Sequence, residues 1–172
     1  MEIWDLFDLH RRPLGRTHER GKPLAEGEYH VSVHVAVFNS AGELLIQRRV
    51  PTKKHWPNMW DMSAAGSVTA GEDSPTGAER ELFEELGIRV SFENIRPSFT
   101  FNYSRGFGDV YILNEDIDLE SLTLQPEEVI DARYASLDEV LAMIDSGEFL
   151  PYHESFIRFL FDRRHETEAY KS

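Results

Sequence analysis

The spacing of apolar residues predicts a sheet in the first half of the chain. Residues 29–38 alternate apolar and polar side chains, with Val31, Val33, Val35 and Val37 on one face. This pattern is typical of a strand that buries one side. A turn is expected at residues 39–42, and further strands are expected at residues 43–48, 61–65, 89–92, 98–103, 110–114 and 130–134.

The N-terminal residues predict a separate hairpin. Residues 2–8 alternate weakly between apolar and polar side chains, and residues 11–15 contain the proline and glycine of a turn. A hairpin that reaches about Arg20 would make residues 1–27 an extension ahead of the main domain. Such a hairpin could also pair across a homodimer.

A helix is predicted to begin at Pro75, with Ser74 as its N-cap and Gly87 as its C-terminal stop. Its apolar residues recur at every fourth position and form a stripe that docks on a sheet. These residues are Ala78, Leu82 and Leu86.

Two more helices are expected at residues 137–144 and 151–164, the second with Phe156, Leu160 and Phe159 facing inward. The predicted elements form a mixed sheet flanked by helices, an α/β (α+β) fold. A chain of 172 residues is expected to form one domain with a sizeable core.

The helix after Pro75 carries an unusual set of carboxylates. Glu81, Glu84 and Glu85 lie at positions i, i+3 and i+4, so they share a face that we expect to stay open. Like charges at this spacing destabilise a helix by about a few tenths of a kcal/mol per pair. A bound Mg²⁺ or Mn²⁺ would turn that repulsion into ligation, because both ions prefer carboxylate oxygens.

Composition narrows the classes of function. The formal net charge of −13 and the pI near 4.9 argue against non-specific binding to nucleic acid or to anionic membranes. The chain has no cysteine, which excludes disulfides and thiol catalysis. It shows no signal peptide and no apolar run of about 18 residues, so a soluble cytoplasmic protein is expected.

The acidic helix and the loop before it resemble one long motif. From residue 66 to residue 88 the chain reads G-x5-E-x7-R-E-x-x-E-E-x-G followed by an aliphatic residue. This resembles the Nudix box at every fixed position. The match joins a loop, a helix and a stop signal in one register, which makes it specific. It implies the Nudix α/β/α sandwich, here with an N-terminal β-hairpin extension.

The resemblance implies a Mg²⁺- or Mn²⁺-dependent hydrolase of a nucleoside diphosphate linked to another group. Water would attack a phosphorus atom, and the P–O–P bridge would break. Glu81 would be a metal ligand or the base that activates this water, and Arg80 would hold its carboxylate. Glu72 would support the loop or bind a second metal through water. The implied metal ligands are the Gly66 carbonyl, Glu81, Glu84 and Glu85.

Segments outside the box resemble the isopentenyl diphosphate isomerase branch of this superfamily, over about residues 1–145. They include residues 29–39, the Arg48-Arg49 pair and residues 54–60. The isomerase uses a cysteine just before the first box glycine and a metal-binding histidine just after it. This chain has Ala65 and Ser67 there, and only His30 matches one of the isomerase's metal histidines. The balance favours a hydrolase on an isomerase-like scaffold.

Candidate substrate contacts lie outside the box. The main basic cluster is Gln47-Arg48-Arg49 with Lys53 and Lys54, which would contact phosphates or form a solvated turn. His30 and His34 share one face of a strand and would bind metal or phosphate, or lie satisfied in the interior. Four aromatic residues would stack on a base or pack in the core: Trp56, Trp60, Phe101 and Tyr103.

Nudix enzymes often place one more acidic residue near the metals, late in the domain. Glu127 and Glu128, just before the strand at 130–134, are the candidates for such a catalytic group, and the alternative is a charged loop. Three functions remain open: a metal-dependent diphosphate hydrolase, which the intact carboxylates favour, an isomerase with non-cysteine acid and base groups, and a non-catalytic nucleotide-binding module. The expected partner is a small phosphorylated molecule.

Overall fold

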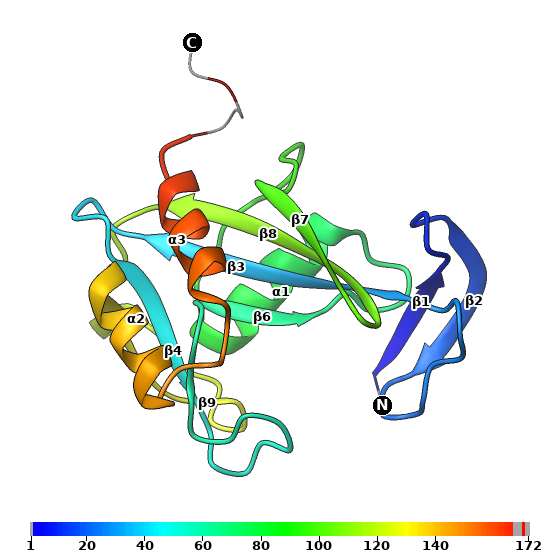
Figure 1. Ribbon diagram of the computed structural model, residues 1–172, viewed down its shortest axis with the longest axis horizontal. Helices are drawn as coiled ribbons and strands as arrows, with labels where there is room; N and C mark the ends of the chain where they lie inside the picture. Colours follow the sequence, from blue (N-terminus) through cyan, green and yellow to red (C-terminus); the bar gives the residue numbers. More distant parts are fainter. Residues whose placement is uncertain (1, 167–169, 171–172) are drawn as a thin grey trace.

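A mixed sheet forms the centre of the molecule, and the computed structural model describes residues 2–166 and residue 170 (Figure 1). Within these residues the sheet has seven strands, in the order β5-β4-β3-β8-β7, with β6 paired to β3 and β9 paired to β4. The strands are β3 (His30–Phe38), β4 (Leu44–Arg49), β5 (Trp60–Asp61), β6 (Ala64–Ser67), β7 (Phe99–Tyr103), β8 (Gly106–Asn114) and β9 (Val129–Ala135). Only the β3–β8 pair among these is parallel, which confirms the expected mixed sheet.

Helices cover both faces of the sheet, which confirms the α/β/α sandwich (Figure 1). The helix α1 (Ser74–Leu86) packs on the face that carries the four alternating valines of β3. The helices α2 (Leu137–Ser146) and α3 (Glu154–Arg163) pack on the other face, against Ala36, Phe38 and their neighbours. A short turn of 3₁₀ helix, η1, spans Leu119–Ser121. No helix in the described part of the chain is long and apolar enough to cross a membrane.

The predicted strand at residues 61–65 is divided into β5 and β6, and Ser63 explains why. The Ser63 hydroxyl donates to the carbonyl of Leu45 at 2.5 Å and accepts from the Val37 amide at 2.9 Å. These bonds replace strand pairing at the point where β3 and β4 diverge, since β3 pairs with β4 only at Phe38. Beyond this point β6 pairs with β3 instead of β4, over Ser32 to Val35 of β3.

Two local predictions were wrong. Asp73, not Ser74, is the N-cap of α1, and its side chain accepts from the Thr76 amide. Ser74 is instead the first helical residue, and its hydroxyl donates to Asp109 at 2.5 Å. Residues 89–92 form no strand. The buried side chain of Phe92 joins the core cluster beside α1, and its amide donates to Glu79 of that helix.

The helix predicted at residues 151–164 also differs in part from the expectation. α3 begins at Glu154 rather than near residue 151, and Leu160 is fully buried as expected. Phe159 is 47% exposed, so it does not face inward.

The expected N-terminal hairpin is confirmed. β1 (Ile3–Phe7) and β2 (Pro13–Glu19) pair antiparallel and lie at one end of the sheet (Figure 1). Phe7 exchanges two backbone hydrogen bonds with Tyr29, just before β3. The loop before α1 donates to β1 from Ala70, to the Ile3 carbonyl at 2.7 Å, and from Gly71, to the Asp5 carboxylate at 2.8 Å. The hairpin is therefore attached to the loop of the sequence motif.

We expect Gly87→Ala to destabilise the protein more than Gly147→Ala. Both glycines end a helix in the left-handed region, with φ of 75° and 77°, where any side chain is strained by about 1 kcal/mol. A Cβ at Gly87 would also lie 2.9 Å from Thr123, whereas nothing lies within 4 Å at Gly147. Urea denaturation should therefore show a loss of about 1 kcal/mol for Gly147→Ala and roughly 2 kcal/mol or more for Gly87→Ala. Equal losses would contradict the steric argument.

Candidate active site

A cavity of about 210 Å³ lies where the acidic face of α1 meets β6. Distant parts of the chain supply its walls, from the N-terminal hairpin to the loop before β9. Carboxylates outnumber cationic groups in its lining. The lining consists of Glu2, Glu81, Glu84, Glu85 and Glu128, of Arg20, Lys53 and Arg80, and of Ala65, Gly66 and Gln125. We refer to it as the carboxylate cavity.

Arg80 ties the carboxylates of this cavity to the loop before α1. Its Nη1 donates to Glu81 at 2.8 Å and to Glu84 at 3.1 Å, and its Nε donates to Glu72 at 2.9 Å. Its Nη2 reaches the Ser67 carbonyl at 2.9 Å. The Glu72 carboxylate also accepts from the Thr69 amide at 3.1 Å. Arg80 and Glu72 therefore have the geometry of groups that hold Glu81 and the loop in place.

Glu85 was predicted to lie on an open face of the helix. It is instead buried, with 4% exposure. Seven residues, or about two helical turns, separate it from Ala78 of the docking stripe, so it projects toward the sheet. Its carboxylate accepts from the Ala65 amide at 3.3 Å and from Gln47 at 3.4 Å. Burial, together with the nearby charges of Glu81 and Asp61, raises the pKa of Glu85 to about 8.

Gly66 lets β6 approach the acidic helix closely. A Cβ atom at this position would overlap the carboxyl group of Glu81, so the site depends on the missing side chain. Burial raises the pKa of Glu81 as well, although Arg80 opposes that shift. Gly66 and Ala65 also line a second cavity, so these two residues of β6 border both cavities.

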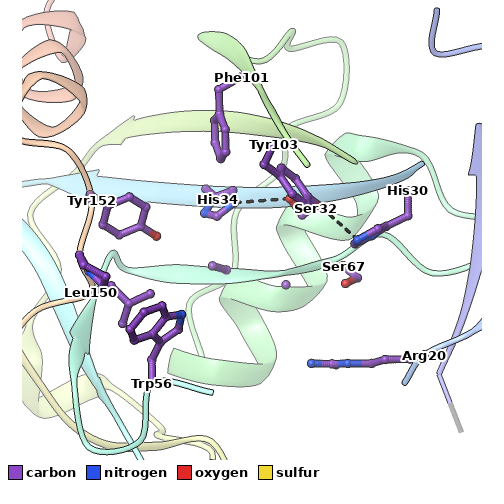
Figure 2. A pocket seen from close by; sticks show the side chains of 13 residues that line it. Arg20, His30, Ser32, His34, Trp56, Ser67, Phe101, Tyr103, Leu150 and Tyr152 are labelled. Atoms are coloured by element: carbon purple, nitrogen blue, oxygen red, sulfur yellow. Dashed lines mark hydrogen bonds between the residues drawn. The ribbon is translucent and has the colours of Figure 1, made fainter. Parts of the chain in front are cut away.

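The second cavity has a volume of about 510 Å³ and is lined mainly by rings and apolar groups. Figure 2 shows Phe101 and Tyr103 of β7 on one side and Trp56 with Leu150 on the opposite side. Three of the predicted substrate contacts, Trp56, Phe101 and Tyr103, are thus brought together. We refer to this space as the aromatic cavity. Its lining is Arg20, His30, Ser32, His34, Trp56, Ala65, Gly66, Ser67, Phe101, Tyr103, Leu150, Pro151 and Tyr152.

His30 and His34 both line the aromatic cavity, from the face of β3 opposite the valines (Figure 2). Burial lowers the pKa of each to about 4, so both rings are neutral at pH 7. Tyr103 lies 3.1 Å from the His30 ring nitrogen Nε2, and Ser32 lies 3.4 Å from that of His34. The histidines are therefore polar but uncharged parts of the wall.

Arg20 lines both cavities, although it was not among the predicted site residues. It follows β2 of the hairpin and pairs with Glu2, which precedes β1. The sequence signal for it was weak, because nothing in the local pattern shows that the hairpin base reaches the acidic helix. Leu150, Pro151 and Tyr152 were missed for the same reason, since the loop before α3 comes from the far end of the chain.

The predicted basic cluster is dispersed. The Arg48 guanidinium lies 5.9 Å from the ring centroid of Trp60, which is buried in the core near α2 and α3. Arg49 Nη1 lies 3.5 Å from the Asp61 carboxylate, and Lys54 is exposed. None of these five residues lines either cavity. Lys53 alone of the cluster's basic residues reaches the carboxylate cavity.

The two acidic residues before β9, Glu127 and Glu128, lie in different surroundings. Glu128 lines the carboxylate cavity and pairs with Lys53. Glu127 is exposed and lines neither cavity. The loop that leads to them is pinned to the end of α1, where the Gln125 amide donates to the Glu85 carbonyl at 3.1 Å.

The donor set of the carboxylate cavity suits a hard divalent cation, which prefers several carboxylate oxygens. Across the residues that the structure describes, no three His, Asp or Glu side chains already surround one point. Arg80 bridges Glu81 and Glu84, and Glu85 faces Gln47 and Ala65. A buried carboxylate such as Glu85, with like charges beside it, is a group that a bound cation would stabilise. The residues therefore fit a metal site.

Comparisons with known proteins agree with this geometry. The family model described as the NUDIX domain matches residues 28–158. An uncharacterised Nudix hydrolase of Listeria monocytogenes is 47% identical over 97% of this chain and 98% of its own length. An isopentenyl-diphosphate Delta-isomerase of Pectobacterium atrosepticum is 30% identical over 78% of this chain and 76% of its own length.

A solved structure shares the fold. The crystal structure of a Deinococcus radiodurans protein matches with a TM-score of 0.73 and 27% identity, over 92% of this chain and 98% of that one. Nudix hydrolases generally use divalent metal ions, and the family generally hydrolyses pyrophosphate bonds in nucleoside diphosphate derivatives. The motif, the fold and the relatives together show that this chain belongs to the Nudix family and is a Nudix pyrophosphohydrolase.

Proposed function

We propose that this enzyme hydrolyses the diphosphate linkage of a nucleoside diphosphate derivative or a related organic pyrophosphate, and that it depends on Mg²⁺ or Mn²⁺. The main support is that the carboxylate cavity and the aromatic cavity meet at Ala65 and Gly66. A substrate that crosses this junction would place its phosphates beside α1 and its remaining group among the rings.

Glu84 and Glu85, with the Gly66 backbone, are the groups that would hold a metal ion. Glu81 would join them or act as the base, and Glu72 would support them. When bound, a divalent cation supplies charge neutralisation for the phosphates and makes a nearby water more acidic. The protein's own part is to present oxygen ligands on a rigid helix. α1 is rigid at this point because Ala78, Leu82 and Leu86 are fully buried against the sheet.

Glu81 is the group best suited to take a proton from the attacking water. Its side chain is 14% exposed, and Arg80 fixes its carboxylate at 2.8 Å. A carboxylate with a raised pKa is a better proton acceptor than an ordinary one. The water oxygen would form a bond to phosphorus, and the bridging P–O bond would break. The leaving phosphate takes the electron pair of that bond, and Glu81 then passes its proton to solvent.

The aromatic cavity favours an uncharged, flat or apolar group. Its two histidines are neutral at pH 7, and Arg20 is the single ordinarily charged residue in its described lining. Stacking on rings such as Trp56 and Phe101 is tolerant of the identity of the group. The wall thus selects against a second charged group at that end of the substrate.

The isomerase alternative has less support from the site. The residues on either side of Gly66 are Ala65 and Ser67, and the chain has no cysteine. The carboxylates of the motif are all present instead. A shared ancestry with isomerases explains the resemblance outside the motif without requiring their chemistry.

A panel of phosphorylated substrates tests the proposal. With Mg²⁺, we expect release of phosphate or a nucleoside monophosphate from at least one nucleoside diphosphate derivative or organic pyrophosphate, and loss of this activity in EDTA. Products separated by anion-exchange chromatography would identify the bond that breaks. Rearrangement of isopentenyl diphosphate without phosphate release, or tight binding of a nucleotide with no product, would refute it.

We expect Glu85→Gln to lower turnover at least about a hundredfold, because it removes a carboxylate from the metal-binding set. Since the carboxylate is buried beside Glu81 and Asp61, the neutral variant should fold at least as well as the wild type. Steady-state kinetics at saturating Mg²⁺ and thermal unfolding would measure both effects.

Glu79→Gln provides a matched control on the same helix. Glu79 accepts from the Phe92 amide and lines neither cavity, and glutamine retains an acceptor oxygen. This variant should keep near-normal turnover. Near-normal turnover of Glu85→Gln would sink the assignment of Glu85 as a metal ligand.

The stability of the metal-free protein should fall as the pH rises from about 4.5 to about 8. The pKa of Glu85 is about 8 in the folded state, against 4.5 ordinarily, so the folded protein holds a proton there that the unfolded chain releases. Melting temperatures recorded in EDTA across this range should decline more steeply for the wild type than for Glu85→Gln. Parallel curves would show that Glu85 does not titrate in this window.

A further inference from the structure

The base of the N-terminal hairpin reaches into the candidate active site, although it lies outside residues 28–158 of the family match. Arg20 lines both cavities and Glu2 lines the carboxylate cavity. Figure 2 shows the Arg20 side chain extended along the edge of the aromatic cavity, on the side of Ser67. No other cationic residue in the described lining is shared by the two cavities.

The charge balance of the carboxylate cavity makes Arg20 the best-placed cationic group for binding a phosphate. A diphosphate that approaches the carboxylate cavity meets five carboxylates in its lining and a protein of net charge −13. Arg80 is already bonded to Glu72, Glu81 and Glu84, and Lys53 pairs with Glu128. The Arg20 side chain is 57% exposed, so its guanidinium has donors available for a phosphate, for which its planar fork is well matched.

Glu2 and Trp4 hold Arg20 at this place. Arg20 Nη1 pairs with one carboxylate oxygen of Glu2, and Trp4 Nε1 donates to the other at 2.7 Å. Trp4 in turn stacks on the His30 ring, with centroids 4.0 Å apart and planes 9° apart. Because His30 lines the aromatic cavity, Trp4 links the Glu2 carboxylate to the wall of that cavity. Its two hydrogen bonds outweigh the effect of burial and keep the pKa of Glu2 below its ordinary value.

The hairpin itself is attached firmly enough to define this geometry. At its turn, Arg11 makes a bidentate ion pair with Asp109, a fully buried residue of β8. Asp109 also accepts from Ser74 at the start of α1 and from Thr100 of β7. With the bonds of Ile3 and Asp5 to the loop before α1, both ends of the hairpin are fixed to elements that build the site.

We propose that Arg20 binds a phosphate of the substrate and that Glu2 is a positioning residue, which orients the Arg20 guanidinium toward the junction of the two cavities. The proposal rests on the proposed hydrolase function. The pair is poorly explained as a stabilising ion pair, because partly exposed pairs contribute only about 0–1 kcal/mol. The N-terminal hairpin is therefore a part of the active site.

Substitution of both residues tests the proposal. Arg20→Met should raise KM by about 10- to 100-fold, the range for loss of charge-assisted hydrogen bonds, with little change in melting temperature. Glu2→Gln should raise KM by about 3- to 10-fold, because the guanidinium remains but is less well oriented. The double variant Glu2→Gln/Arg20→Met should match Arg20→Met alone, and Arg20→Lys should recover part of the loss.

Arg16→Met is the matched control. Arg16 lies on the same hairpin, is 59% exposed and pairs with Glu28 at 2.7 Å, but it lines neither cavity. Its KM should equal that of the wild type. An Arg20→Met effect no larger than that of Arg16→Met would overturn the role of Arg20. Additive effects of Glu2→Gln and Arg20→Met would overturn the positioning role of Glu2.

Calorimetric titration with imidodiphosphate in Mg²⁺ separates this inference from the proposed hydrolysis. The wild type should bind this non-hydrolysable probe, and Arg20→Met should bind it about 10-fold or more weakly. That result would support the phosphate-binding role even if no compound of the substrate panel were hydrolysed. Equal affinity of the two proteins would refute the role even in an active enzyme.

Discussion

The burial of one carboxylate among others is the constraint on which the site depends. α1 docks through three fully buried apolar side chains, Ala78, Leu82 and Leu86, and burial of each leucine is worth about 1.5–3 kcal/mol. Repulsion between neighbouring glutamates costs only about a few tenths of a kcal/mol per pair. Docking of the stripe outweighs this repulsion and carries Glu85 inside, where the larger cost of removing its carboxylate from water is met by the raised pKa. The resulting excess of negative charge is relieved in part by Arg80 and by a raised pKa, and a cation would relieve the rest.

Local periodicity was enough to predict most of the fold. The alternating valines of β3 and the apolar stripe of α1 each define a buried face without help from distant residues, and the structure buries both. The burial of Glu85 was also present in the sequence, since its spacing of seven from Ala78 returns it to the docking face. Residues 89–92 misled the prediction because an apolar pattern shows burial of Ile88 and Phe92 but not whether a neighbouring strand is there to pair.

The carboxylate set could be identified from spacing, whereas the rest of the site could not. Glu81, Glu84 and Glu85 lie on one helix, so their proximity follows from helix geometry. Arg20 and Tyr152 line one cavity, on opposite sides of it, only because the hairpin and the loop before α3 both reach that cavity (Figure 2). The sequence also could not show that Arg48 lies near the Trp60 ring and Arg49 near the Asp61 carboxylate, rather than in the lining of either cavity.

Ala65 and Gly66 of β6 border two cavities of different character, which bears on how an acidic protein accepts an anion. Charged groups gather on the α1 side of Gly66, while the other side has neutral histidines and rings. In the proposed function, the phosphates would lie on the α1 side, where a bound cation and Arg20 would offset the carboxylates, and the remaining group would lie against the rings. Arg20 lines both cavities, so in its proposed role it would both attract the anion and set the direction in which the substrate lies. The residues of the motif lie on α1, on β6 and in the loop between them, and in this proposal the hairpin would add orientation to them.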